Sequence, residues 1–321
     1  MHGMNTPDLP VLECIPNFSE GRDLDVVDAI VDAIASVPGI LLLRRESDVD
    51  HNRSVITFAG EPDAVVGAAV AGVACAVERI DLTSHSGAHP RMGATDVVPF
   101  VPIRGLSMED AAAFARTAAD RIWSELRVPV YLYEDSAVRP DHVNLADLRR
   151  GQFERIRDSI ATEAHRAPDI GDRAVHPTAG IVAVGARKPL IAWNVLLDTT
   201  DVALAKRIAR EVRGSSGGLP TVKALGFAIP SKGHVQVSMN LTDYRTTPMH
   251  VAFEAVRLAA ERLGVGILGT ELIGLVPQDA LAATAEHYLR IREFSIERVL
   301  EPRIDSVHRS SQMSTDQYWE R

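Results

Sequence analysis

The sequence lacks long apolar runs, a leader-like N-terminus and more than two cysteines. No apolar run approaches the ~20 residues that a membrane-spanning helix needs, so we expect no membrane partner. The first ten residues, MHGMNTPDLP, have no basic region followed by an apolar stretch, unlike a signal peptide. Cys14 and Cys75 are too few for a disulfide framework and lie in apolar segments, so we expect both to be small core residues. These absences predict a cytoplasmic protein.

Positive charge is also scarce. The chain has 34 Lys and Arg against 43 Asp and Glu, which gives a net charge of −9. Nucleic-acid binding depends on neutralising phosphates with Lys and Arg, so nucleic acid is not an expected partner. An anionic small substrate is compatible with this balance if the positive charge is local. The length of 321 residues, with 46% apolar and 24% charged residues, predicts a soluble globular protein with two ordinary domains or one large one.

The order of apolar patterns is the same in the two halves of the chain. Each half reads as strand, helix, strand, strand, helix, strand, which is the split βαβ or ferredoxin-like order. In the first half these elements are expected at 11–18, 24–37, 40–43, 54–59, 62–79 and 97–103, followed by a helix opened by Ser107 and Asp110 and a strand at 129–134. In the second half they are expected at 190–198, 201–213, 222–229, 234–241, 247–264 and 265–275.

This order predicts an α/β (α+β) fold with two ferredoxin-like βαββαβ sandwich subdomains. Each mixed sheet should carry helices on one face and must bury the other, so the two sheets are expected to face each other across a cleft or substrate tunnel. The predicted boundaries are 1–180 for the N-terminal subdomain, 181–299 for the C-terminal subdomain and 300–321 for a polar tail.

The densest group of chemically active residues is the segment HSGAHPRMGATDVVPFVPI, which starts at His85. It places two histidines and Arg91 in a short loop before a strand, and such loops often carry function. The spacing of His85 and His89 suggests a metal, but zinc proteases need that spacing on a helix, with Glu directly after the first His. Ser86 follows His85 here and Pro90 follows His89, so no metal site is predicted; a metallohydrolase stays as an alternative.

Four weaker clusters have two interpretations each. ESDVDHNR at 46–53 supplies acids that orient a histidine or bind a cation, or forms a solvated loop between strands. IPNFSEGRD at 15–23 offers helix N–H groups to an anion, or caps the helix through Ser19. GSSGGLP at 214–220 resembles a phosphate loop but lacks the Lys-Ser/Thr ending. GARKP at 185–189 brings Arg187 before a strand, or is a charged turn.

Several longer strings resemble those of one family, glutamate formimidoyltransferase, also called formiminotransferase. The matching strings, in order along the chain, are ECIPNFSEGRD, DHNRSVITFAG, HSGAHPRMGATDVVPFVPI, VPVYLYE, GARKPLIAWN, QVSMNLTDY and TPMHVAFE. The resemblance implies two α/β subdomains with a substrate tunnel between them, and a homodimer. It also implies transfer of a formimino group from N-formimino-L-glutamate to N5 of tetrahydrofolate, in histidine degradation. We expect a stand-alone form without the cyclodeaminase domain.

The resemblance also implies roles for individual residues. The second histidine of the HxGxHPRMG string, His89, is the implied catalytic residue. The functional acid of the family aligns with Glu46, although Arg44 replaces a neighbouring acid, and Asp48 is a substitute candidate. The folate-binding stretch falls on 171–180, and the folate contacts carried over are Gly171, Asp172, Arg173, His176, Gly180 and Arg213.

The chemistry of the reaction suggests the remaining contacts. A guanidinium pairs with a carboxylate through two hydrogen bonds, so Arg53, Arg91 and Arg187 are candidate ligands of the anionic substrates. Asn17 and Glu20 are candidates for the formimino end or the pterin. Tetrahydrofolate is expected as a co-substrate, with no metal. A related folate-linked formyltransferase, a 5-formyltetrahydrofolate cycloligase and a non-catalytic folate-binding protein are the alternatives.

Overall fold

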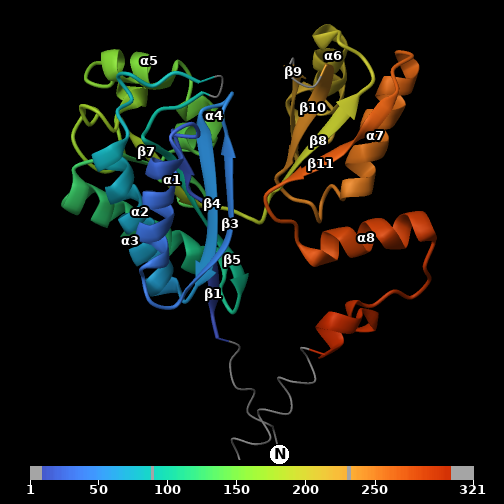
Figure 1. Ribbon diagram of the computed structural model, residues 1–321, viewed down its shortest axis with the longest axis horizontal. Coiled ribbons are helices and arrows are strands. Elements are labelled where there is room, and N and C mark those ends of the chain that lie inside the picture. The colour runs from blue at the N-terminus through green and yellow to red at the C-terminus, as the bar shows by residue number, and fades with distance from the viewer. Residues whose placement is uncertain (1–8, 88–89, 230–232, 305–321) are drawn as a thin grey trace, which may run out of the picture. The chain divides into compact units, whose positions relative to one another are not determined.

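The chain folds into two compact units, each built around one β-sheet (Figure 1). The structure is a computed structural model that describes residues 9–87, 90–229 and 233–304. Of the described residues, 9–188 form the first unit and 189–304 form the second. The fold is therefore an α+β arrangement of two subdomains. No helix in these ranges is long and apolar enough to cross a membrane.

The first subdomain contains a seven-stranded sheet in which β1 and β2 share one position. Its strands are β1 (Val11–Cys14), β2 (Asn17–Phe18), β3 (Ile40–Asp48), β4 (Arg53–Gly60), β5 (Thr95–Arg104), β6 (Val130–Glu134) and β7 (Val182–Ala186). Its helices are α1 (Leu24–Ala35), α2 (Pro62–Arg79), α3 (Met108–Leu126), α4 (Leu145–Leu148) and α5 (Gln152–Ser159). Strands β3, β4, β1/β2 and β5 lie in the ferredoxin-like order, all antiparallel to their neighbours. The expected βαββαβ core is confirmed, and β7 and β6 extend it in parallel.

Local sequence signals explain where the helices of this subdomain begin. The Asp23 carboxylate accepts from the backbone N–H groups of Asp25 and Val26 and so caps α1. Ser107 and Asp110 form the capping box of α3, as predicted. Ser19, in contrast, is not the cap of α1, because its hydroxyl donates to the Gly93 carbonyl 2.7 Å away. The expectation of a Ser19 cap was wrong because Asp23 lies directly before the first helical turn.

Helices α1, α2 and α3 cover one face of the sheet, where alternate strand residues make a large apolar cluster (Figure 1). The other face is also partly covered, which differs from the prediction of helices on one face only. Leu148, Ile156 and Ile160, from α4 and the end of α5, pack against Tyr131 and Tyr133 of β6. A second apolar cluster thus closes the β5–β7–β6 end of the sheet, because Met92, Val97, Ile181 and Ala183 also point into it.

The second subdomain has the minimal ferredoxin-like topology. Its elements are β8 (Ile191–Leu197), α6 (Val202–Val212), β9 (Val222–Ile229), β10 (His234–Leu241), α7 (Met249–Arg262), β11 (Ile267–Ile273) and α8 (Gln278–Leu289). The antiparallel sheet has the order β11–β8–β10–β9, and α6 and α7 pack on one of its faces. Helix α7 begins at Met249, with Pro248 at the cap, one residue later than predicted. The Thr247 hydroxyl is instead hydrogen-bonded to Thr221, 2.7 Å away.

Strand β7 lies on the far side of the predicted boundary at 180/181. It pairs in parallel with both β5 and β6, so residues 182–186 belong to the first subdomain and the division falls after Lys188. The sequence did not predict β7, because a five-residue buried strand of Val, Ala and Gly has no alternating pattern. At the other end of the chain, residues 300–304 are helical, and the rest of the predicted polar tail lies outside the described residues.

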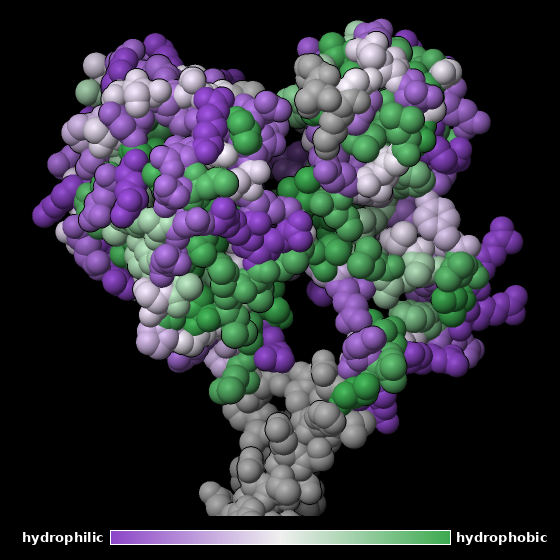
Figure 2. Space-filling model, viewed as in Figure 1, coloured by the Kyte–Doolittle hydropathy of each residue, from purple (hydrophilic) through white to green (hydrophobic). Residues whose placement is uncertain are grey.

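Strand β3 is longer than predicted and changes character along its length. It continues to Asp48, so the segment expected as a charged loop is mostly strand. Its beginning exposes three leucines, Leu41, Leu42 and Leu43, and Figure 2 shows an apolar surface there, at the lower end of the first subdomain. The charged residues that follow lead along the edge of the sheet to the turn before β4, where the candidate site begins.

Candidate functional site

Three loops of the first subdomain meet at one buried asparagine, Asn52. Its side-chain oxygen accepts from the Gly21 backbone N–H at 2.9 Å, and its amide donates to the Ser86 carbonyl at 3.1 Å. Its own carbonyl is 3.0 Å from Nε2 of His85. Asn52 adopts a left-handed backbone conformation with φ 48°, which Asn tolerates better than most residues. The residue thereby ties the β2–α1 loop, the β3–β4 turn and the loop before β5 together.

Two glycines allow this close approach. A Cβ atom at Gly21 would lie 2.5 Å from the Asp48 carbonyl oxygen and 2.6 Å from the Arg53 nitrogen. A Cβ atom at Gly87 would lie 2.3 Å from the His51 carbonyl oxygen. Real Cβ contacts are not this short, so both positions require glycine for the three loops to touch.

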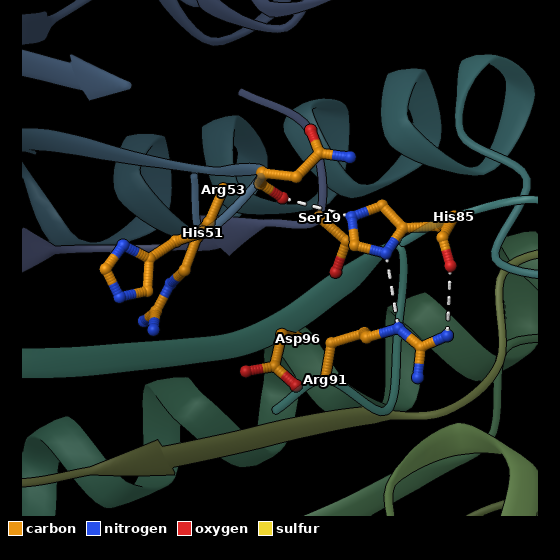
Figure 3. A pocket seen from close by; sticks show the side chains of 7 residues that line it. Ser19, His51, Arg53, His85, Arg91 and Asp96 are labelled. Atoms are coloured by element: carbon orange, nitrogen blue, oxygen red, sulfur yellow. Dashed lines mark hydrogen bonds between the residues drawn. The ribbon is translucent and has the colours of Figure 1, made fainter. Parts of the chain in front are cut away.

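These loops enclose a narrow pocket, shown in Figure 3. Its lining residues are Ser19, His51, Asn52, Arg53, His85, Arg91 and Asp96. The empty space is about 180 Å³. This space includes open solvent and nowhere admits a water-sized molecule, whereas sites that bury a whole small ligand usually enclose ~300–1,000 Å³. The pocket is therefore a tightly packed cluster of side chains.

His85 is fixed in the pocket wall by both of its ring nitrogens. Nδ1 lies 3.2 Å from Nε of Arg91, and a guanidinium nitrogen only donates, so Nδ1 must accept. The single ring proton therefore lies on Nε2, which donates to the Asn52 carbonyl. Both ring nitrogens of His85 thus contact neighbouring groups, which gives the ring a structural role in the pocket wall.

Arg91, predicted as a substrate ligand, is already fully engaged. Its two terminal nitrogens pair with both carboxylate oxygens of Glu154, at 2.8 and 2.6 Å, in a bidentate ion pair. The hydrogen bonds from Arg91 lower the pKa of Glu154 to about 2. Because its Nε also contacts His85, Arg91 links helix α5 to the loop before β5. It shapes the pocket and offers little further capacity for a ligand.

Arg53 is a second cation in the wall of this pocket. Burial, and then the neighbouring charge of Arg149, lower the pKa of Arg53 to about 10. Asp96, only 2% exposed, partly offsets this repulsion; it forms an ion pair with Arg149 and accepts the Met92 N–H at 2.9 Å. Asp48 also acts to raise the Arg53 pKa, because a nearby anion favours the charged form.

Asp48, at the end of β3, contacts His51 in the turn between β3 and β4. One carboxylate oxygen accepts the His51 backbone N–H at 2.8 Å, and the other is 2.9 Å from Nδ1 of the ring. Partial burial acts to raise the pKa of Asp48, but these hydrogen bonds and the charge of His51 outweigh it and keep the pKa below its usual value. Asp48 is therefore a committed partner of a pocket-lining imidazole.

The other predicted residues near this region that the structure describes have defined partners. His89 lies outside the described residues. Glu46 lies on β3, two residues before Asp48, and accepts from Arg44 at 2.7 Å. Asn17 is buried in β2 and donates to the Ile15 carbonyl at 2.8 Å. The Glu20 carboxylate accepts three successive backbone N–H groups, from Gly21 to Asp23, at 2.8–3.0 Å, which is a local capping contact.

The predicted folate stretch, residues 171–180, approaches the site only at its C-terminal end, and none of its residues lines the pocket. Gly180 forms an antiparallel bridge with Gly93, directly after the pocket segment. His176 accepts the Ala179 N–H at 3.0 Å, and burial lowers its pKa. Gly171 adopts φ 104° against the Trp123 ring. Asp172 and Arg173 are exposed, and Nε of Arg173 donates to the Ile160 carbonyl at 3.4 Å.

The last two predicted arginines lie elsewhere. Arg187 follows β7, where its N–H donates to the Phe100 carbonyl at 3.0 Å, several residues along β5 from the pocket. Its charge lowers the pKa of Glu13, which burial raises overall. Arg213 belongs to the second subdomain, at the end of α6, and its Nε donates to Ser216 at 2.8 Å. Neither residue lines the pocket.

Sequence reasoning missed several residues that build the site. His51, Asn52 and Asp96 line the pocket, and Arg149 pairs with Asp96. The first two stand in the DHNR string and the third in the ATDVV string, so the signal was present but not assigned to individual side chains. Arg149 had no signal, because it reaches the site from the end of α4. Among the described residues, no group of three or more His, Cys, Asp or Glu could hold a metal ion.

Comparison with known proteins places both subdomains in one family. The sequence profile of the formiminotransferase domain, N-terminal subdomain, matches residues 11–187, and that of the formiminotransferase domain matches residues 192–307. The chain is 46% identical to the glutamate formimidoyltransferase of Streptococcus pyogenes serotype M1, over 88% of this chain and 95% of that protein.

Two further relatives agree. The glutamate formimidoyltransferase of Thermoplasma acidophilum is 46% identical over 93% of this chain and 99% of its own length. The formimidoyltransferase-cyclodeaminase of Mus musculus is 40% identical over 87% of this chain, which spans 52% of that protein. With both subdomains matched and relatives aligned over nearly their whole length, the chain belongs to the formiminotransferase family.

Proposed function

We propose that this protein is a glutamate formimidoyltransferase, which moves the formimino group of N-formimino-L-glutamate to N5 of tetrahydrofolate in histidine degradation. The observation that carries the proposal is the narrow, arginine-lined pocket built by the same strings that carry the family resemblance. Two relatives that are 46% identical over most of the chain bear that name. Tetrahydrofolate is then a co-substrate, and no metal takes part.

The reaction needs one proton to move from one nitrogen to another. N5 attacks the formimino carbon, a tetrahedral intermediate forms, and the bond to the glutamate nitrogen breaks. The N5 proton must leave, and the departing nitrogen must gain one. We assign this general acid–base role to His89, two residues before the pocket-lining Arg91. An imidazole suits the task because its ordinary pKa lies near neutral pH. Glu46 and Asp48 are the acids proposed to assist.

The anionic substrates need fixed cations. Arg53 is the proposed ligand of a glutamate carboxylate, because an anion would offset the burial and repulsion that lower its pKa. Arg91 would act indirectly, by holding the pocket wall through Glu154 and His85. Asn17, Glu20 and Arg187 stay candidates for the rest of the substrates. Residues 171–180 and Arg213 are the proposed folate contacts. Holding both substrates in one geometry supplies much of the rate increase of such a transfer.

The test is an assay of glutamate release with purified protein, tetrahydrofolate and N-formimino-L-glutamate. We expect release with the formimino donor and none with N-formyl-glutamate. Release from the formyl donor alone would favour the formyltransferase alternative, and ATP-dependent conversion of 5-formyltetrahydrofolate would favour the cycloligase. Folate binding without turnover of any donor would indicate a binding protein. His89→Ala should lose ~10²–10⁴ in kcat while remaining folded, and full activity in that variant would remove His89 from the mechanism.

We further propose that the enzyme works as a cytoplasmic homodimer. The family resemblance supports the dimer. The low number of cysteines, Cys14 buried and Cys75 partly buried, supports the cytoplasm. Light scattering coupled to size-exclusion chromatography measures the assembly directly. A monomeric mass with full activity would contradict the dimer.

A further inference from the structure

A row of three residues crosses the first sheet and has an acid at one end and a guanidinium at the other. Glu13 of β1 pairs with Val101 of β5. On the other side of β5, Phe100 pairs with Ala186 of β7, so the next residue, Arg187, lies beside Val101. The row points away from α1, α2 and α3, because side chains alternate along a strand and the neighbours of the row point into the cluster beneath these helices. Those neighbours are Leu12, Cys14, Phe100 and Ala186.

The Glu13 carboxylate is half-buried and accepts no hydrogen bond from any residue that the structure describes. Burial raises its pKa, and the charge of Arg187 lowers it by a smaller amount. A cation that donated hydrogen bonds to Glu13 would offset the cost of this burial. Other acids near the candidate site differ, because each already has a partner. They are Glu20, Glu46, Asp48, Asp96 and Glu154.

The other end of the row combines Arg187 with a tyrosine hydroxyl. Nη1 of Arg187 donates to the Lys188 carbonyl at 3.0 Å, and the rest of its guanidinium has no hydrogen-bond partner in the described part of the chain. The Tyr133 ring lies over Gly185, where a Cβ atom would be 2.7 Å from the ring. Tyr133 is 2% exposed, yet its hydroxyl contacts no hydrogen-bonding group among the described residues. Burial raises the pKa of Tyr133, so the hydroxyl keeps its proton and can donate.

These groups fit a ligand that carries a cation beside a carboxylate. The two ends of the row are ~10 Å apart at the backbone, two strand spacings, so long side chains can approach one ligand from both sides. N-formimino-L-glutamate has this character, since an amidine is protonated at neutral pH and the α-carboxylate is attached to the adjacent carbon. We propose that Glu13 binds the formamidinium group of the donor, and that Arg187 and Tyr133 bind its α-carboxylate. This inference rests on the proposed function.

The row adjoins the pocket without being part of it. The Tyr133 hydroxyl is influenced by the charge of Arg149 as well as by that of Arg187. Arg149 in turn forms an ion pair with Asp96, which lines the pocket. The donor would therefore lie along the sheet beside the packed side chains of the pocket. Glu13, Tyr133 and Arg187 stand in three of the strings that carry the family resemblance, ECIPNFSEGRD, VPVYLYE and GARKPLIAWN.

Glu13 in this position selects the formimino donor over a formyl donor. A formamidinium offers two N–H groups to the two oxygens of a carboxylate, which makes a charge-assisted bidentate contact. A formyl group is neutral and presents a carbonyl oxygen where the second N–H would be, so it repels the carboxylate. Glu13 forms no covalent bond. Its charge keeps the formimino group protonated, and the protonated carbon is the better target for N5.

The first test compares two ligands in Glu13→Gln. KM for N-formimino-L-glutamate should rise by ~10–100-fold, because hydrogen bonds to a charged group are lost. The inhibition constant of N-formyl-L-glutamate, a competitive inhibitor, should stay within a few-fold. A structural role would move both constants together, so an unchanged ratio overturns the proposal. Glu109→Gln is the control, because it removes the same charge from an exposed position on α3 and should match the wild type.

The second test uses Arg187→Gln and Tyr133→Phe. Both ligands contain the α-carboxylate, so each variant should weaken both equally, by ~10-fold for Arg187→Gln and a few-fold for Tyr133→Phe. 4-(Formimidoylamino)butanoate, which lacks that carboxylate, should be insensitive. Arg104→Gln, at the exposed end of β5, is the control. A rise in KM for tetrahydrofolate alone would overturn the assignment of Arg187. If Glu13→Gln fails to fold, judged by circular dichroism, wild-type constants in both variants overturn the proposal.

Calorimetry without tetrahydrofolate distinguishes failure of this inference from failure of the proposed function. The wild type should bind N-formimino-L-glutamate more tightly than N-formyl-L-glutamate, and Glu13→Gln should lose that preference. A wild type that shows the preference but releases no glutamate with tetrahydrofolate contradicts the transferase and keeps the subsite. An active wild type without the preference, or a preference that survives in Glu13→Gln, contradicts the subsite and keeps the transferase.

Discussion

The two subdomains share one topology but treat the uncovered face of the sheet differently. In the first, α4 and α5 close one end of that face, and three loops converge on Asn52 to build the pocket. In the second, a row of polar side chains lies on the corresponding face, where Gln236 donates to Ser238 at 3.3 Å, Ser238 donates to Asn194, and Asn194 donates to Glu271 at 3.3 Å. In the first subdomain the polar groups on this side of the fold come from loops, and in the second they come from the strands of the sheet.

The difference lies in how each polar group is held. Asn52 bonds backbone groups from two distant loops, whereas Asn194 bonds side chains of neighbouring strands. Backbone partners cannot turn away when the asparagine is removed, but side chains such as Ser238 can reorient towards water. Each of the following predictions pairs a change in the first subdomain with a counterpart or a control.

The largest effect is expected from Asn52→Ala against Asn194→Ala. Both asparagines are 7% exposed, so burial alone does not separate them. Asn52→Ala loses two hydrogen bonds worth ~1 kcal/mol each and forces alanine into a left-handed conformation that costs ~1–2 kcal/mol, about 3–4 kcal/mol in all. Asn194→Ala should cost about 1 kcal/mol or less. Thermal unfolding measures both, and equal losses would remove the distinction between the two faces.

The next effect concerns loop packing, through Gly21→Ala against Gly269→Ala. The new methyl group at 21 would meet backbone atoms of Asp48 and Arg53 within 2.6 Å, whereas nothing lies within 4 Å of one at 269. Forced overpacking typically costs ~1–3 kcal/mol, so Gly21→Ala should lower the melting temperature and also reduce turnover. Gly269→Ala should change neither by much. Full activity in Gly21→Ala would mean that the three loops need not touch.

A smaller effect is expected on substrate binding, in Arg53→Lys against Arg213→Lys. A lysine cannot reproduce a bidentate contact, so Arg53→Lys should raise KM for N-formimino-L-glutamate by about tenfold, or ~1.4 kcal/mol. Arg213→Lys should instead raise KM for tetrahydrofolate. Steady-state kinetics with each substrate varied in turn separates the two. The opposite pattern would exchange the roles assigned to the two arginines.

The smallest effect is the acid sensitivity of the Arg91–Glu154 pair. The folded pKa of Glu154, about 2, is below its ordinary 4.5, so the pair stabilises the protein above about pH 4.5 and this contribution is lost as pH falls towards 2. Because the Glu154 side chain is 53% exposed, solvent screening limits the contribution to about 1 kcal/mol at most. Glu154→Gln should melt lower than the wild type at pH 7, with a difference that shrinks near pH 4. Arg121, which pairs with Glu125 on the surface of α3, supplies the control Arg121→Gln.

The sequence predicted which segments form the candidate site, but it did not predict which side chains contact each other there. The string around His85 and the DHNR string were both recognised, and they meet in the pocket. Their roles divided differently: Arg91 was predicted as a ligand but holds Glu154, and Asp48 was predicted to assist His89 but contacts His51. The sequence shows that an arginine is present, but it does not show whether its guanidinium will contact a substrate or another side chain of the protein.

The sequence by itself determined the two ferredoxin-like cores, because alternating and 3.6-residue apolar patterns, caps such as Ser107 with Asp110 and stops such as Pro38-Gly39 act over a few residues. It also determined the family, through long strings in order. Only the tertiary structure decided that β7 inserts beside β5, that α5 closes the second face and that Asn52 joins three loops. These contacts connect residues from distant segments, such as Gly21 with Asn52 or Val97 with Ala183, and no local pattern in the chain records which partner each group will meet.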